Sequence, residues 1–349
     1  MQKHIVLDAD APNSSGGVQQ VSAEDKEAVD QLRGQYDRMR QELAKVIIGQ
    51  DKVVEEMLIC VLSRGHGLLM GVPGLAKTLM VNSLSKLMSL GFSRIQFTPD
   101  LMPSDITGTE ILQEGEAGRR EFEFVKGPIF ANIILADEIN RTPPKTQAAL
   151  LEAMQEHQVT LEGHTHQLQQ PFVTVATQNP IESEGTYPLP EAQLDRFMMK
   201  LSIGYPSRPI ERAIIVKRMQ RMKDEHDVRA LASPEKLVQM QVSLEKVKVD
   251  EKIIEYIVEI VNRTREDPRV AVGSSPRGTQ ALFKLTRALA VLNGRDYVVP
   301  DDVKRLAIHA LRHRLILKPE PRIKGVQPEE IISQILQEVE VPTTQGYTD

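Results

Sequence analysis

Short apolar segments alternate with helical ones through the first part of the chain. Five segments have the apolar, β-branched character of buried strands: His66–Met70, Ser93–Phe97, Asn132–Ala136, Phe172–Ala176 and Met198–Ile203. Apolar residues at helical spacing predict helices before and between them: Ser22 to about Lys45, Asp51–Arg64, Thr78–Leu90, Pro143–His157 and Glu191–Arg196. This alternation is typical of a mainly parallel sheet covered by helices, so we expect an α/β domain over residues 22–203.

Two segments interrupt this alternation. Residues 122–125 (Phe-Glu-Phe-Val) are strand-like and follow a glycine-rich turn at residues 115–118. Residues 159–168 alternate polar and apolar positions about Glu162-Gly163, which is a hairpin signal. Both segments are therefore predicted to be insertions that project from the sheet.

The last part of the chain is helical by its periodicity. A Pro/Gly-rich linker at residues 204–209 is followed by these predicted helices: Ile210–Arg221, Pro234–Gln241, Asp250–Arg265, Arg277–Asn293, Asp301–Ile316 and Pro328–Glu338. We expect an all-helical domain over residues 210–340. Residues 1–21, rich in small and polar side chains, are expected to form a flexible N-terminal tail, and residues 341–349 a C-terminal one.

Composition narrows the class of protein. A length of 349 residues, 41% hydrophobic and 26% charged, suits a globular protein with two domains. The net charge of −5, with 4% aromatic residues and no Trp, gives no reason to expect nucleic acid as a partner. Without a long apolar run or the apolar core of a signal peptide, the simplest compartment is the cytoplasm. Cys60, the only cysteine, lies in an apolar run and is expected in the core.

A glycine-rich loop carries the first chemical signal. Residues 71–78 read Gly-Val-Pro-Gly-Leu-Ala-Lys-Thr, between a predicted strand and a predicted helix. Backbone N–H groups and the helix N-terminus in such a loop bind phosphate. Lys77 can reach the terminal phosphates, and the Thr78 hydroxyl can ligate Mg2+. Ala76 stands where the general pattern has its last glycine. The alternative is a simple Gly/Pro turn with an exposed lysine.

Polar side chains also follow two other predicted strands. Asp137 and Glu138 end a buried strand, at the sheet edge that also carries the phosphate loop. Asp137 can hold Mg2+, and Glu138 can orient and deprotonate an attacking water. Asn179 follows the next strand and can act as a polar sensor of the γ-phosphate, or simply initiate a turn before Pro180.

Arginines at two positions are candidates to complete a phosphate site. Arg196, just before the last strand, cannot easily fold back onto its own phosphate loop and could serve a neighbouring subunit as a finger. Arg277 begins a helix in the second domain and could reach a nucleotide. Arg141, just after the acidic pair, is an alternative arginine acting on a neighbour.

Histidines at regular spacings have simpler interpretations. His157, His164 and His166 have ligand-like spacing, but no Cys or carboxylate completes an evident metal site. His309 and His313 are four residues apart and lack the Glu of a zinc protease motif, so we expect them on a solvated helical face.

Taken in order, the phosphate loop, Asp137-Glu138, Asn179, Arg196 and Arg277 resemble the Walker A, Walker B, sensor 1, arginine finger and sensor 2 motifs of AAA+ ATPases. More narrowly, the chain resembles the MoxR family, whose phosphate loops commonly carry alanine at the position of Ala76. The segments that carry this resemblance are residues 71–78, 135–154, 175–180, 189–197 and 275–278.

The resemblance implies an AAA+ P-loop core followed by a helical lid, with ATP and Mg2+ as ligands. Glu138 would be the catalytic base, supported by Lys77, Asn179, Arg196 and Arg277. Asp137 and Thr78 would hold Mg2+. The nucleotide would contact Ile48, Gly49, Gly71, Val72, Pro73, Gly74, Leu75, Ala76, Lys77, Thr78, Leu79 and Asp137. Ile48 and Gly49 match the segment that packs on adenine in this family.

The resemblance also implies a ring assembly and a function in remodelling other proteins. The two insertions match a helix-2 insert and a pre-sensor-1 hairpin, which face the ring axis in relatives. The family forms rings, usually hexamers, that remodel or activate metalloenzymes and other protein complexes, often with a von Willebrand factor A partner. Relatives with these inserts displace the lid, so Arg277 could serve either its own or a neighbour's nucleotide.

Two other functions share many of these motifs. The ATPase subunit of a metal chelatase carries nearly all of them. A nucleic-acid-acting AAA+ motor or transcription activator is the second alternative. The chain contains nothing like the activators' Gly-Ala-Phe-Thr-Gly-Ala loop, and the predicted hairpin tip at Glu162-Gly163-His164 lacks the basic residues that DNA would require.

Overall fold

The computed structural model describes residues 23–114, 120–161, 163–181 and 185–343. The predictions for the tail at 1–21, the glycine-rich turn at 115–118, Glu162 at the hairpin tip and the chain end from 344 lie outside these residues.

A five-stranded parallel sheet forms the centre of the first domain, with strand order β2-β5-β8-β1-β9. Its strands are β1 (Gly67–Met70), β2 (Phe92–Gln96), β5 (Ile133–Asp137), β8 (Val173–Gln178) and β9 (Met199–Ser202). All five strands predicted from the sequence are therefore confirmed, to within two residues at each end. The central strands β5 and β8 are almost continuously buried, as strands covered on both faces must be.

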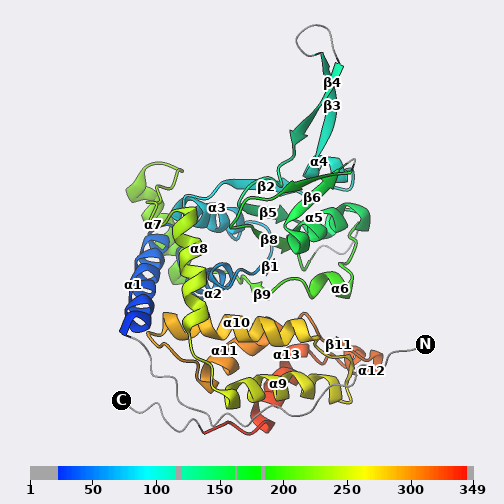
Figure 1. Cartoon of the computed structure of the whole chain (residues 1–349). Helices are drawn as coiled ribbons and strands as arrows, with labels where there is room; N and C mark the ends of the chain where they lie inside the picture. The colour runs from blue at the N-terminus through cyan, green and yellow to red at the C-terminus, as the bar shows by residue number, and fades with distance from the viewer. Residues whose placement is uncertain (1–22, 115–119, 162, 182–184, 344–349) are drawn as a thin grey trace, which may run out of the picture.

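Helices cover both faces of this sheet (Figure 1). The main helices of this domain are α1 (Ala23–Val46), α2 (Asp51–Leu62), α3 (Lys77–Leu87) and α5 (Pro144–Glu156). Neighbouring strand residues point to opposite faces, so Leu69 belongs to the core beneath α1, α2 and α3, whereas Leu68 belongs to the core beneath α5. Cys60, on α2, is buried in the first of these cores, as predicted, and burial raises the pKa of its thiol to about 12. The prediction of an α/β core is thus confirmed.

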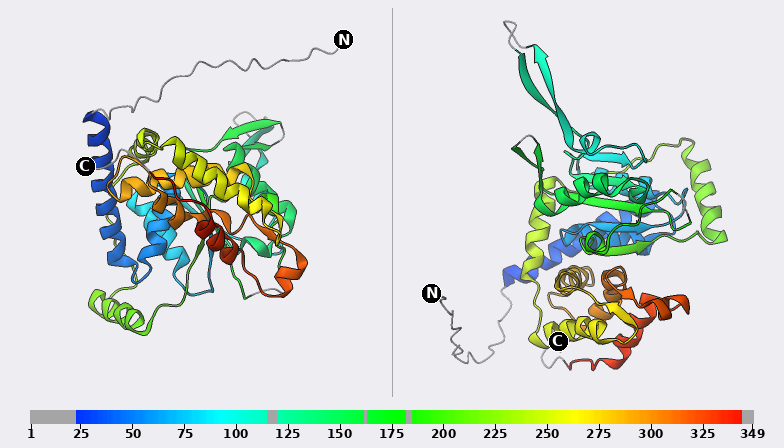
Figure 2. Two further views of the ribbon diagram at one scale, coloured as in Figure 1. Left: turned by 90° about the horizontal axis from the view of Figure 1, so that it is seen from below. Right: turned by 90° about the vertical axis from the view of Figure 1, so that its right-hand side faces the viewer.

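The C-terminal part is a helical layer on the opposite side of the sheet domain from the long β3–β4 ribbon (Figures 1 and 2). Its elements are η2 (Leu244–Lys246), α9 (Glu251–Glu266), β10 (Val270–Val272), α10 (Pro276–Leu292), α11 (Pro300–Leu311), β11 (Ile316–Leu317), α12 (Pro319–Ile323) and α13 (Pro328–Glu338). Helix α8 (Pro234–Ser243), which leads into this layer, packs against α1 and α2 beside the sheet domain (Figure 1). The expectation of a purely helical region is wrong in one place, because β10 and β11 pair as a small antiparallel sheet. The helix predicted to reach Ile316 ends at Leu311, since His313 and Arg314 turn inward to bond the segment before β9.

Helix α7 (Arg208–Arg221) lies beside the sheet domain, near α1, rather than within the helical layer (Figure 1). Lys217 Nζ donates a hydrogen bond to the Ala44 carbonyl on α1. The boundaries drawn from the sequence at residues 203, 210 and 340 assign α7 to the second domain, and they stay predictions.

Two antiparallel hairpins leave the sheet domain. The short one pairs β6 (Gln158–Leu161) with β7 (His164–Gln167), as predicted. The long one pairs β3 (Gly108–Glu114) with β4 (Arg120–Lys126), whereas the sequence pattern indicated only the second strand. Adjacent Ile111 and Leu112 break the alternation expected of a strand, which explains the omission.

The bases of the two hairpins are in contact. Phe124 of β4 stacks on His166 of β7 with ring centroids 3.9 Å apart, and Phe130 packs edge-on against both rings. His166 therefore packs against aromatic rings. Short helices complete the domain: α4 (Pro103–Thr107), η1 (Ile139–Arg141) and α6 (Glu191–Leu194). None of the helices described is long and apolar enough to cross a membrane.

Candidate active site

The phosphate loop joins β1 to the N-terminus of α3. Gly74 and Ala76 both have left-handed backbone conformations, with φ of 85° and 59°. Ala76 is the N-cap of α3, and Lys77 is the first residue of the helix. The buried Lys77 side chain curls over the loop, where its Nζ donates to the Gly71 carbonyl at 2.7 Å. A left-handed turn that leads into a helix N-terminus directs backbone N–H groups inward, which suits a phosphate group.

Asp137 is the last residue of β5 and is buried. The Thr177 hydroxyl donates to one of its carboxylate oxygens at 2.6 Å. Arg94 of β2 donates to the other through Nε at 3.1 Å and Nη2 at 2.7 Å. The carboxylate is thus oriented by the strands on both sides of it. Oxygen donors of this kind, from Asp137 and the Thr78 hydroxyl, fit the coordination preference of Mg2+.

Glu138 follows directly in a left-handed conformation, with φ of 58°. Its backbone N–H donates to the Thr177 hydroxyl at 2.9 Å. Its carboxylate oxygen Oε2 accepts hydrogen bonds from Gln96 Nε2 and from Arg141 Nη1, each at 3.0 Å. Arg141 therefore pairs with the Glu138 of its own chain in this structure.

Asn179 lies just after β8, which is between β5 and β1 in the sheet. It is buried, and its side-chain oxygen accepts a hydrogen bond from the Ile181 N–H at 3.2 Å. This bond closes a turn around Pro180, as expected for an Asn that precedes a proline. Because parallel strands end at one edge, the sheet brings the phosphate loop, Asp137, Glu138 and Asn179 to the same edge.

A pocket of about 280 Å³ adjoins the phosphate loop. Its wall includes residues 46–48 and 50 before and at the start of α2, residues 74–76 and 79 of the loop and α3, and Ile214, Ile215, Arg218 and Arg221 of α7. Ile48, Gly74, Leu75, Ala76 and Leu79 of the predicted nucleotide contacts line it. Gly49 is adjacent in sequence and has φ of 73°, and a Cβ there would overlap Ile210. The apolar wall beside a phosphate loop has the character of a base-binding pocket.

Arg196 and Arg277 lie at the other edge of the sheet. Both line a pocket of about 200 Å³, together with His66, Gln155 and Arg314. His66 precedes β1 and Arg196 precedes β9, so this pocket is at the amino ends of the parallel strands. The four residues of β1, which span about 13 Å, separate this edge from the phosphate loop. Arg196 Nη1 donates to the Leu151 carbonyl, and Nε finds no hydrogen-bond partner among the residues described.

The prediction of a solvated face for His309 and His313 is wrong. His309 pairs with the buried Glu56 at 3.2 Å, and its side chain is only 16% exposed. His313 lies beyond the end of α11 and is within hydrogen-bond distance of the Phe197 carbonyl at 2.8 Å. A spacing of four residues places two side chains on one face only within a continuous helix, whereas α11 ends before His313 and the chain turns inward there.

Sequence reasoning missed three residues that contact the acidic pair: Thr177, Arg94 and Gln96. Their signal is strand register rather than a motif. Gln96 lies opposite Asp137 in the pairing of β2 with β5, and Thr177 follows Ala176, which lies opposite Ala136 in the pairing of β8 with β5. Register between strands far apart in sequence cannot be obtained from local periodicity.

Known proteins resemble this chain over most of its length. Residues 66–199 match the ATPase family associated with various cellular activities (AAA), and residues 262–335 match the AAA lid domain. "Uncharacterized protein YeaC" of Bacillus subtilis (strain 168) is 49% identical over 298 residues, which cover 85% of this chain and 92% of that protein. "Chaperone MoxR1" of Mycobacterium tuberculosis is 45% identical over 310 residues, covering 86% and 81%.

A solved structure agrees with these sequence matches. The crystal structure of a putative ATPase from Cytophaga hutchinsonii has a TM-score of 0.85 and 42% sequence identity. The match covers 92% of this chain and 98% of the other. The likeness therefore extends over both the sheet domain and the helical layer.

Proposed function

Because this chain belongs to the MoxR family of AAA ATPases, which bind and hydrolyse ATP, we propose that it uses hydrolysis in a ring of identical subunits to remodel or activate protein complexes. Members of the AAA family usually assemble into oligomers. A hexameric ring, Mg2+ and a protein client belong to this proposal.

One observation supports an active site that is shared between two neighbouring subunits. Lys77 and Glu138 lie at the carboxyl edge of the sheet, whereas Arg196 and Arg277 share a pocket at the amino edge. The arginines of one subunit therefore do not face its own phosphate loop. Stacking subunits head to tail around a ring would bring the amino edge of one against the carboxyl edge of the next.

Each side chain then has a role in hydrolysis. Lys77 and the loop N–H groups bind the β- and γ-phosphates. Ile48 and Leu79 line the pocket for the base, and Gly49 follows Ile48 in the chain. Glu138 accepts a proton from the attacking water, and Asn179 orients the γ-phosphate. Thr78 and Asp137 would hold Mg2+, which neutralises phosphate charge when bound.

Arg196 from the neighbour stabilises the charge that develops on the transferred phosphoryl group, an effect on the order of 10³-fold or more in rate. The shared pocket supports assigning Arg277 to the same neighbouring nucleotide as Arg196. In this proposal Arg277 acts on the ATP of the next subunit and not on that of its own.

The β3–β4 ribbon supports a protein client. Leu112 and Phe122 lie opposite each other on the ribbon and are 51% and 73% exposed. Exposed apolar side chains on a projecting ribbon can contact unfolded or partly assembled protein. A partner with a von Willebrand factor A domain is part of the same proposal, and the chaperone name of the mycobacterial relative is consistent with it.

The Glu138→Gln variant tests the proposal. We expect it to bind ATP with unchanged affinity, to form rings with ATP in sedimentation experiments, and to lose turnover by on the order of 10²-fold or more. Glu255→Gln, an exposed carboxylate on α9, is the control and should hydrolyse ATP normally. Wild-type phosphate release by Glu138→Gln would remove the assigned base.

The Glu138→Gln variant, kept in its ATP-bound state, can also be used to identify the protein client. Affinity capture from native lysate should recover a von Willebrand factor A protein together with its client. Dependence of tetrapyrrole metallation on this chain would instead identify a chelatase subunit, and a salt-sensitive gain in single-stranded DNA affinity on adding ATP would identify a nucleic-acid motor.

A further inference from the structure

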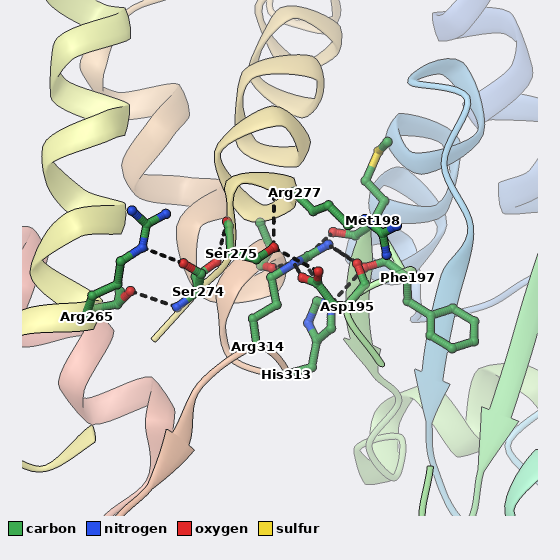
Figure 3. Close-up of polar contacts among 11 residues, drawn as sticks. Asp195, Phe197, Met198, Arg265, Ser274, Ser275, Arg277, His313 and Arg314 are labelled. Atoms are coloured by element: carbon green, nitrogen blue, oxygen red, sulfur yellow. Dashed lines mark hydrogen bonds and ion pairs between the residues drawn. The ribbon is translucent and has the colours of Figure 1, made fainter. Parts of the chain in front are cut away.

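Arg314 is a buried cation that joins the helical layer to the sheet domain (Figure 3). Its side chain is only 2% exposed, and it comes just after α11. Its Nε donates to the Asp195 carboxylate at 2.9 Å. Its Nη2 donates to the backbone carbonyls of Asp195 and Phe197 at 3.1 and 2.8 Å, and its Nη1 to that of Met198 at 3.3 Å. One guanidinium thus binds nearly the whole segment between α6 and β9.

Asp195 makes a second connection to the helical layer. The Ser275 hydroxyl donates to its other carboxylate oxygen at 2.8 Å. The same hydroxyl accepts the Arg277 backbone N–H at 3.0 Å and caps the N-terminus of α10. The Asp195 carboxylate therefore links the C-terminal end of α11 and the N-terminal end of α10.

The loop before α10 is held in place as well. Arg265 Nε donates to the Ser274 carbonyl at 2.8 Å, and the Ser274 N–H donates to the Thr264 hydroxyl at 3.1 Å. These contacts attach the loop to α9, so the start of α10 has little freedom to move independently of the helical layer.

The two arginines of the amino-edge pocket extend from this network. Arg196 follows Asp195 directly, and Arg277 is two residues beyond Ser275. A third arginine, Arg314, lines the same pocket. Burial lowers the pKa of Arg314 to about 10, so it stays charged near neutral pH and requires its carboxylate partner. Separating Asp195 from Arg314 would leave a buried charge unpaired, which makes this contact between the domains hard to open.

We propose that Arg314 is a positioning residue that, through Asp195 and Ser275, holds Arg196 and Arg277 as one rigid unit for the ATP of the neighbouring subunit. The proposal rests on the function proposed above. The helical layer then contributes to ATP hydrolysis in the neighbouring subunit. Its side chain Arg314 determines where residues 195–198 lie, and these residues include the Arg196 finger.

The first test is kinetic and uses the Arg314→Met variant of the full chain. We expect kcat for ATP to fall by about tenfold or more while KM changes by less than about twofold, because the variant's own phosphate loop is untouched. Arg295→Met is the matched control. Arg295 donates two hydrogen bonds to the buried Asp302 carboxylate inside the helical layer, and its own side chain is 22% exposed. Among the described residues it has no contact with residues 195–198. Its kcat should stay within about twofold of wild type.

The second test separates positioning from general damage. Subunits with Glu138→Gln are expected to be nearly inactive while still presenting their arginines to wild-type neighbours. Adding Arg314→Met to these inactive subunits should lower the turnover of mixed rings further, whereas adding Arg295→Met should not, with ring composition checked by native mass spectrometry. Equal turnover of the two mixtures would overturn the proposal.

A gentler variant covers the case in which Arg314→Met does not fold. Ser275→Ala removes the hydroxyl between Asp195 and Arg277 and should lower kcat, whereas Ser233→Ala, which removes only the cap of α8, should not. Normal kcat in Ser275→Ala would contradict the proposal. Failure of the function itself gives a different result, since wild type would then not hydrolyse ATP, or Arg196→Ala would hydrolyse it normally.

Discussion

Ala76 is the residue at which the phosphate loop departs from the general Walker A pattern. Its backbone conformation shows that this departure is energetically unfavourable. Its φ of 59° lies in the left-handed region, where a Cβ is unfavourable by about 1–2 kcal/mol. Glycine, the residue of the general pattern, accepts this conformation freely. The chain therefore tolerates local strain at the start of α3.

Replacing Ala76 by glycine should relieve that strain. We expect Ala76→Gly to change the free energy of unfolding by about 0 to +1 kcal/mol, because relief of strain is partly offset by the greater freedom of glycine in the unfolded chain. Ala76→Val should instead destabilise the protein and weaken ATP binding, since a β-branched residue fits a positive φ poorly. Urea denaturation and ATP titration measure both effects.

Ala148 provides the matched control. It is exposed inside α5, where glycine is unfavourable by about 1 kcal/mol. If Ala76→Gly destabilised the protein as much as Ala148→Gly, the strain assigned to Ala76 would be absent.

At the scale of elements, the contact between α2 and α11 contains a buried titratable pair. Glu56 and His309 are 3.2 Å apart with side chains 5% and 16% exposed, and Lys52, Arg305 and Arg312 lie around them. Burial raises the pKa of Glu56 from 4.5 to about 7 and lowers the pKa of His309 from 6.5 to about 4. Between about pH 4.5 and 6.5 the pair holds one proton whether the chain is folded or unfolded, so it adds little pH dependence to stability.

Replacing His309 should make the free energy of unfolding depend on pH through the ionisation of Glu56. In His309→Gln, the folded chain keeps the Glu56 proton up to about pH 7, while the unfolded chain releases it near pH 4.5. Stability should then fall as the pH rises through this window, by at most about 3 kcal/mol. Urea denaturation at several pH values measures it. The double variant Glu56→Gln/His309→Gln is the control, and a slope equal to that of His309→Gln would refute the role of Glu56.

The elements also show where periodicity is sufficient. The strands of the central sheet and helices such as α5 and α13 agree with the pattern to within two residues. The strands are short, almost wholly apolar runs, and the helices have an apolar face at helical spacing. Strand β3 and the end of α11 could not be predicted. Pairing with β4 stabilises Ile111 and Leu112 in a strand, and hydrogen bonds to residues 195–198 turn His313 and Arg314 away from a helix.

At the scale of the whole molecule, the two edges of the sheet carry the two halves of the proposed site. This separation predicts complementation between inactive subunits. Arg196→Ala alone should lose on the order of 10³-fold or more in turnover. Glu138→Gln alone should lose on the order of 10²-fold or more. Mixed rings should regain part of it, because a Glu138→Gln subunit supplies Arg196 to the intact phosphate loop of an Arg196→Ala neighbour.

Phosphate release from purified mixtures measures this recovery. The control mixes Glu138→Gln with Lys77→Ala, which damages the same edge twice and should stay inactive. A mixture of Arg196→Ala and Glu138→Gln that remained inactive, in rings shown to contain both subunits, would exclude a site shared between neighbours.

The sequence by itself determined the α/β core, the phosphate loop at residues 71–78 and the acidic pair Asp137-Glu138. Each depends on residues close together in the chain, and parallel strands necessarily bring their carboxyl ends to one edge. Only the tertiary structure decided which polar groups orient that pair and where the arginines lie. Arg314 and Asp195 are 119 residues apart, and no local period records their contact. Their pairing, and the shared pocket of Arg196 and Arg277, arise from packing between two domains, which folding alone establishes.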